Sequence, residues 1–160
     1  MSRNHKSEIY INSDLLTRGT VVDSYYNLDL PIMNVKKFLV TDILCPQLYK
    51  SQIEADGQIS ALLHANFTDS HGYQLFQRTN ANTGSKSDIV ARVPFAAYDT
   101  NLTNIFYQTT SDFYVREDPQ NIIQCIRLWW TDEFGNTLDA SLFDSAWYCR
   151  LIFYHDNPQL

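Results

Sequence analysis

The stretch WYCRLIFY, from Trp147 to Tyr154, gives the clearest indication of the fold. Apolar side chains occupy every second position, at Trp147, Cys149, Leu151 and Phe153. Successive side chains of a strand point to opposite faces of its sheet, so a period of two predicts a strand with one buried face. An amphipathic helix would instead repeat about every 3.6 residues.

A second stretch, Ile122–Thr131, has the same period. Its two faces carry Ile126, Leu128 and Trp130 on one side and Cys125, Arg127 and Trp129 on the other. Aromatic side chains on such faces bury about 150–250 Å² each when two sheets pack together. We therefore expect a core that contains Leu128, Trp130, Trp147, Leu151 and Phe153.

Seven further segments show strand-like patterns, and turn-rich clusters separate them. They are Glu8–Asn12, Val35–Leu44, Ala61–Thr68, Tyr73–Arg78, Asp88–Val93, Ile105–Thr109 and Asp112–Arg116, and strand-like sequence also occurs at Tyr25. Only Pro119–Gln124 and Leu138–Ser145 suit a helical turn. Short strands without helical crossovers predict an all-β, antiparallel sandwich. The 160 residues suit a single jelly roll of about eight strands better than an immunoglobulin-type sandwich, which needs only about 100 residues.

The composition is poor in charge, with 19% charged residues against about 25% in typical domains. Ser, Thr, Asn and Gln supply 45 of the 160 residues, so uncharged polar groups replace much of the usual charged coat. A surface of this kind repels neighbours weakly. It is compatible with permanent protein neighbours and equally with an ordinary loop-rich β domain.

The charge balance argues against nucleic-acid binding, because the net charge is −6 and the basic residues are scattered. No apolar run is long enough for a membrane span, and the polar start of the chain is unlike a secretory signal. We therefore expect synthesis in the cytosol. Cys45, Cys125 and Cys149 are odd in number and lie in apolar runs, which predicts free thiols rather than a disulfide framework.

Catalytic and metal-binding patterns are missing from the sequence. The four histidines contain no pair spaced to hold one ion, and His64 is predicted to be a solvated or hydrogen-bonded strand residue and His71 a turn residue. No G-x-S-x-G elbow or phosphate-binding glycine loop occurs. Asp132 and Glu133 could form a glycosidase pair, but a turn in which Gly135 or Asn136 takes a positive φ is favoured. We expect no enzymatic activity, no cofactor and no metal.

The order of several short motifs resembles the penton and minor capsid proteins of double-jelly-roll icosahedral viruses, such as giant viruses, virophages and Polinton-like viruses. The motifs are Ile11–Ser13, Gly19–Thr20, Cys45–Pro46, Ile89–Pro94, Leu128–Asn136 and Trp147–Phe153. The resemblance spans nearly the whole chain and rests on the order of the motifs more than on any one of them. The sequence departs from the family pattern at Asp23–Tyr25, where an aromatic residue would directly follow the acidic one.

The resemblance implies a capsid structural protein, most simply a penton that forms a homopentamer at the fivefold vertices. One jelly roll is too small to be the double-jelly-roll major shell protein. The implied partners are further copies of this chain, the major capsid protein and neighbouring minor capsid proteins, without direct nucleic-acid contact or membrane insertion. The implied location is the capsid vertex of the virion, assembled inside the host cell.

The sequence suggests an extended N-terminal arm over residues 1–8, ahead of a jelly-roll domain over residues 9–160. In the family such arms tie a vertex subunit to its neighbours, so Arg3, Asn4 and His5 are candidate assembly contacts. Arg18, Gly19 and Thr20 are further candidates. The alternative is a first strand that forms a hairpin within its own sheet, with Arg18–Thr20 as the turn.

The sequence is also compatible with two other functions. A minor protein that cements capsomers belongs to the same class. A trimeric TNF-like or lectin-like binding module belongs to a different class, because a jelly roll does not fix function. Glycan binding would need exposed aromatic side chains beside polar loops, and Tyr73, Tyr98 and Tyr107 are the candidates.

Overall fold

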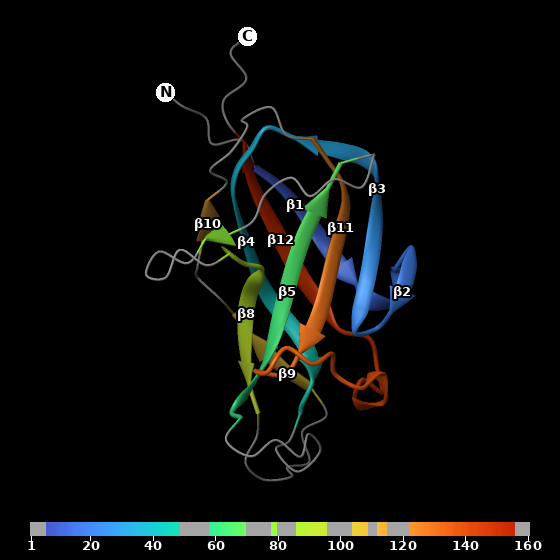
Figure 1. Ribbon diagram of the computed structural model, residues 1–160. Coiled ribbons are helices and arrows are strands. Elements are labelled where there is room, and N and C mark those ends of the chain that lie inside the picture. The colour runs from blue at the N-terminus through green and yellow to red at the C-terminus, as the bar shows by residue number, and fades with distance from the viewer. Residues whose placement is uncertain are drawn as a thin grey trace.

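The computed structural model is a β-sandwich (Figure 1). It describes residues 6–48, 58–69, 78–79, 86–95, 104–108, 112–114 and 122–155. The strands are β1 (Lys6–Asn12), β2 (Arg18–Thr20), β3 (Asp23–Met33), β4 (Val35–Pro46), β5 (Ser60–Thr68), β6 (Arg78–Thr79), β7 (Lys86–Ser87), β8 (Ile89–Pro94), β9 (Asn104–Tyr107), β10 (Asp112–Tyr114), β11 (Ile122–Thr131) and β12 (Tyr148–His155). Two 3₁₀ turns, η1 (Ser13–Leu15) and η2 (Ala140–Leu142), are the helical elements of these ranges. None of the helical segments in this part of the chain is long and apolar enough to cross a membrane.

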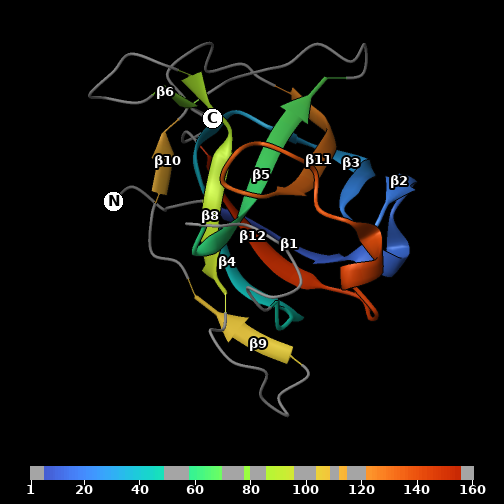
Figure 2. The same cartoon turned by 60° about the horizontal axis from the view of Figure 1, so that its bottom comes forward.

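Two antiparallel sheets face each other (Figure 2). The first, which we call the β12 sheet, has the order β1-β12-β4, with β9 and β10 both paired to the outer side of β4. The second, the β11 sheet, has the order β2-β3-β11-β5-β8. Among the described strands, β6 and β7 form a separate two-stranded pair.

The strand pairing is that of a jelly roll. β9 and β10 lie end to end along β4, because β9 faces Ile43–Pro46 and β10 faces Lys37–Leu39, so they act as one interrupted strand. With β2, β6 and β7 set aside, eight strands remain, and the first pairs with the eighth, the second with the seventh, the third with the sixth and the fourth with the fifth. This is an antiparallel ribbon rolled into two sheets, the jelly-roll arrangement. The predicted fold class is confirmed.

Aromatic side chains fill the gap between the sheets. The rings of Trp130 and Trp147 meet edge to face with centroids 5.3 Å apart. Phe67 from the β11 sheet makes the same kind of contact with Phe38 at 4.9 Å and with Phe153 at 5.4 Å, both from the β12 sheet. The residues expected in the core are all 0% exposed, namely Leu128, Trp130, Trp147, Leu151 and Phe153.

The alternation read from the sequence holds along Ile126–Trp130 and Trp147–Phe153, where Arg127, Trp129, Tyr148 and Arg150 lie between buried residues. Ile152, on the other face of β12, is buried as well. The expected strands agree with β1, β4, β5, β8, β9, β10, β11 and β12 to within a few residues. β3, which the sequence suggested only at Tyr25, is one of the longest strands. Most of the expected strand Tyr73–Arg78 lies outside the described residues.

Arg18–Thr20 is a strand, β2, and not a turn. Gly19 has φ +96°, and a Cβ there would lie 2.2 Å from the Asp23 carbonyl oxygen, so the glycine serves close strand pairing. β1 pairs with β12 and forms no hairpin with β2. β1 also begins at Lys6, so residues 6–8, expected in the arm, belong to the sheet, and residues 1–5 lie outside the described residues.

The expected helical turns had different outcomes. Leu138–Ser145 contains η2, as predicted. The helical turn predicted for Pro119–Gln124 is wrong over its described part, because residues 122–124 form the start of β11. Residues 119–121 lie outside the described part of the chain.

Trp147→Ala should lower the free energy of unfolding by about 3–5 kcal/mol, because it removes a fully buried ring from the contact between the sheets. It also removes the indole hydrogen bond from Nε1 to the Val21 carbonyl at 2.7 Å. Denaturant titration measures the change, and Tyr148→Ala, on the exposed face next to Trp147, is the control. A loss below about 1 kcal/mol would contradict the packing described above.

Candidate functional site

Arginine and aromatic side chains alternate across the outer face of the β11 sheet. Arg18 Cζ lies 4.2 Å from the ring centroid of Tyr25, and Arg127 Cζ lies 5.4 Å from the same ring and 4.3 Å from that of Trp129. His64 stacks on Trp129 at 4.9 Å. The strand registers produce this series, because Tyr25 pairs with both Arg18 and Arg127, and Trp129 pairs with His64. We call Arg18, Tyr25, Arg127, Trp129 and His64 the outer row.

The charge of Arg127 is neutralised within the same face. Its Nε and Nη2 donate to the two carboxylate oxygens of Asp23, each at 2.9 Å. The hydrogen bond to Asp23 is the main cause that raises the pKa of Arg127. A bidentate ion pair with Asp23 therefore fixes the guanidinium near the rings of Tyr25 and Trp129.

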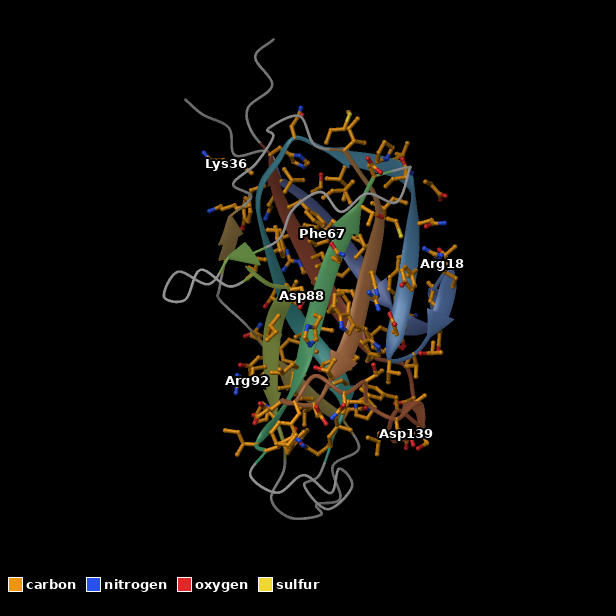
Figure 3. The ribbon with its side chains drawn as sticks, in the orientation of Figure 1. Arg18, Lys36, Phe67, Asp88, Arg92 and Asp139 are labelled. Carbon is orange, nitrogen blue, oxygen red and sulfur yellow. The ribbon has the colours of Figure 1, made fainter. Side chains whose placement is uncertain are left out.

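His64, in β5 at the other end of the outer row, contacts Thr131 at the end of β11 and Asp88 just before β8. Nδ1 lies 2.7 Å from Asp88 Oδ1, and Nε2 lies 2.7 Å from Thr131 Oγ1. Figure 3 shows Asp88 on the β5–β8 side of this face and Arg18 at the opposite edge. The prediction of a hydrogen-bonded strand residue is confirmed for His64, and His71 lies outside the described residues.

Asp88, His64 and Thr131 are hydrogen-bonded in the order acid, histidine, hydroxyl, as in the catalytic triad of a hydrolase. The Thr131 hydroxyl, however, is unsuited to attack a substrate. Thr131 is 3% exposed, and its hydroxyl donates to the Asp132 carbonyl at 2.8 Å. The hydrogen bonds of His64 therefore link β5 to β11 and to Asp88, the residue that directly precedes β8. Within the described ranges, no group of three His, Cys, Asp or Glu side chains is placed to hold a metal ion.

Asp132 and Glu133 are committed to the structure of a turn. Asp132 Oδ1 accepts from the backbone N–H groups of Phe134 and Asn136, each at 2.9 Å, and Gly135 has φ +88°. Glu133 accepts from the Ser60 hydroxyl at 2.7 Å and pairs with Arg92. The favoured interpretation as a turn, with a positive φ at Gly135, is confirmed.

The outer face of the β12 sheet carries a second neutralised cluster. Arg150 pairs with Glu8 from β1 and with Asp42 from β4, and Lys6 also pairs with Glu8 at 3.2 Å. Asp42 has φ +52° at a register shift in β4, which places its carboxylate where it also accepts from Gln108 at 3.0 Å. The bulge thus brings an acid to the arginine at the centre of this face.

The residues proposed as assembly contacts divide into two groups. Arg18, Gly19 and Thr20 form the exposed edge strand β2, and Arg18 opens the outer row. Arg3, Asn4 and His5 lie outside the described residues. The sequence placed Arg127 and Trp129 on one face of a strand, but only the registers of β3 and β5 show that Tyr25 and His64 join them.

The proposed glycan-binding aromatics gain no common surface among the described residues. Tyr107 is half-buried and packs against the core. Tyr73 and Tyr98 lie outside the described ranges.

No family model matches the sequence, and no curated protein matches it. Among solved structures, the chain is similar to one described as the structure of infectious bursal disease virus, Gx strain, with a TM-score of 0.40 and 10% identity. The alignment covers 98% of this chain and 34% of the other, so this chain spans about a third of that neighbour. A likeness at this TM-score has no bearing on function.

Asp88→Asn should lower the stability at about pH 7 by about 1 kcal/mol, because it removes a charged hydrogen bond on a partly exposed face. The hydrogen bond from His64 is the main cause that lowers the pKa of Asp88 from 3.8. The carboxylate's contribution is therefore complete above that value and is lost as the pH falls through the lower native pKa.

Unfolding titrations of wild type and Asp88→Asn at a series of pH values test this expectation. The stability difference should shrink below about pH 4. Asp29→Asn, at an exposed acid, is the control. A difference that grows as the pH falls would contradict the assigned role of Asp88.

Reductant and chelator should each leave the thermal midpoint unchanged. The three cysteines are free, and burial raises the pKa of the Cys45 thiol to about 12 and also raises that of Cys149. Such thiols are neutral and unreactive at physiological pH. A clear drop in the midpoint with either reagent would reveal a disulfide or a metal that stabilises the fold.

Proposed function

We propose that this chain is a structural protein of an icosahedral viral capsid and that five copies form the penton at each fivefold vertex. The order of the motifs that resemble penton and minor capsid proteins, found on a sandwich with the jelly-roll pairing, supports the proposal. Motifs of the family resemblance lie in regular elements of the sandwich, because Ile89–Pro94 is β8 and Leu128–Asn136 is the end of β11 with its turn. Trp147–Phe153 covers most of β12.

The chemistry of the two outer faces supports close contact with neighbours. Arg127 is paired with Asp23, and Arg150 with Glu8 and Asp42, so the central arginine of each face already has a partner. Covering a neutralised pair is less costly than covering a lone charge. Trp, Tyr and Arg, the side chains of the outer row, are also those that dominate binding energy in interfaces.

The edges of the sheets offer the contacts that a ring requires. The Ser13 N–H donates to the Trp147 carbonyl at 3.0 Å, which continues the β1–β12 register beyond Asn12. Hydrogen-bonded pairs alternate in an antiparallel ladder, so the backbone groups of Lys6, Glu8, Tyr10 and Asn12 face away from β12. No described strand pairs with that edge of β1, nor with the outer edge of β8.

A closed ring needs a heterologous interface, in which one side of a subunit meets the opposite side of the next. β1 and β2 lie at one open side of the sandwich, and β8 and β9 lie at the other (Figure 2). These two sides supply the distinct surfaces. The major shell protein and minor capsid proteins are the further partners in this proposal, and the virion vertex is the location.

Deletion of residues 1–5 should lower the number of copies per purified particle and leave the thermal midpoint unchanged. The reason is that the deletion removes the expected arm but leaves β1, which begins at Lys6, intact. Deletion of residues 1–12 is the comparison, because it also removes the β1 ladder and the buried Ile11 and should therefore destabilise the domain.

Quantitative mass spectrometry of particles and thermal melts of the purified chains give the two readouts. Full occupancy of particles by the variant that lacks residues 1–5 would show that the arm has no part in assembly. Absence of the wild-type chain from particles would contradict the proposed function itself.

A further inference from the structure

The corner at which β3 turns into β4 carries three large apolar side chains that are exposed. Leu30 is 83% exposed, Met33 52% and Ile122 45%. Ile122 pairs directly with Met33 across β11 and β3, and Leu30 is three residues from Met33, at most about 10 Å along the strand. We call Leu30, Met33 and Ile122 the β3 corner patch.

A bulge in β3 presents Leu30. Asn27 pairs with Cys125 and Ile32 with Ile123, so the four residues Leu28–Pro31 stand opposite the single residue Gln124. Both ends of the bulge are anchored, because Ile32 is buried and Leu28 packs against the core. Gln124 Nε2 also donates to the Leu28 carbonyl at 2.6 Å.

The corner is tied to the neighbouring strands as well. His155, at the end of β12, donates from Nδ1 to the Met33 carbonyl at 2.6 Å, and its Nε2 lies 2.7 Å from the Ser7 hydroxyl of β1. Asn34, with φ +58°, makes the turn into β4. The exposed leucine therefore sits on a backbone that is fixed on both sides, and such preorganisation favours binding.

The location of the β3 corner patch and its small area together indicate which kind of partner binds it. The patch lies at the end of the sandwich where β4 begins, the end at which Figure 3 shows Lys36, whereas ring neighbours would meet through the open sides. A stable dimer buries about 800 Å² on each partner, and three partly exposed side chains cover only a fraction of that area. The patch therefore suits one contact among several with a partner that other contacts also hold.

We propose that the β3 corner patch docks into an apolar socket on a shell protein of different sequence that surrounds the vertex. This inference rests on the proposed function and names the surface through which the vertex subunit joins the shell. Leu30 is the central anchor, and Met33 and Ile122 flank it.

Leu30→Asp tests the inference, with Leu15→Asp as the matched control. Leu15 is also a highly exposed leucine, 74%, but lies in η1 at the opposite end of the sandwich. Both variants should melt like wild type, because neither side chain is buried. Leu30→Asp should reduce the number of copies per purified particle by about tenfold or more, and Leu15→Asp should not.

A photo-crosslinking residue at position 30 or at position 15 then identifies the partner in assembled particles. Position 30 should crosslink to a polypeptide other than this chain. Crosslinks from position 30 to a second copy of this chain, or equal incorporation of both aspartate variants, would overturn this inference and leave the proposed function standing. Absence of the wild-type chain from particles would overturn both.

Discussion

The structure depends on the contact between its two central strands, β11 and β12, across the gap between the sheets. Trp130 and Trp147 meet edge to face, and Leu128, Leu151 and Phe153 complete a layer that water does not reach. Each central strand pairs with a neighbour on both sides, so the remaining strands take their positions from these two. Burial of such rings is the largest favourable contribution available to a domain of this kind.

The alternation of side chains along β11 and β12 determines the outer faces of the two sheets as well as the core. Residues between the buried positions point outward, so β11 presents Arg127 and Trp129 and β12 presents Tyr148 and Arg150. Neighbouring strands then bring an acid to each arginine, Asp23 in one sheet and Glu8 with Asp42 in the other. The outer faces are consequently rich in aromatic and paired groups, which suits a protein that is covered by neighbours on several sides.

Sequence reasoning found the fold because every second residue is apolar and buried along Ile126–Trp130 and Trp147–Phe153. It underestimated β3, because the bulge Leu28–Pro31 breaks the period and places a proline and exposed residues within the strand. The alternative in which Arg18–Thr20 is a turn was wrong, because Gly19 here permits the close approach of β3 rather than a reversal of the chain. The outer row and the exposure of Leu30 depend on register between distant segments, which a single sequence does not encode in any local pattern.

Reconstruction of purified particles by electron cryo-microscopy tests the central claim most directly. The account predicts five copies of this eight-stranded sandwich around each fivefold axis, in contact through their open sides, with the β3 corner directed toward the surrounding shell. Three copies in a projecting knob, or vertices built without this chain, would contradict it.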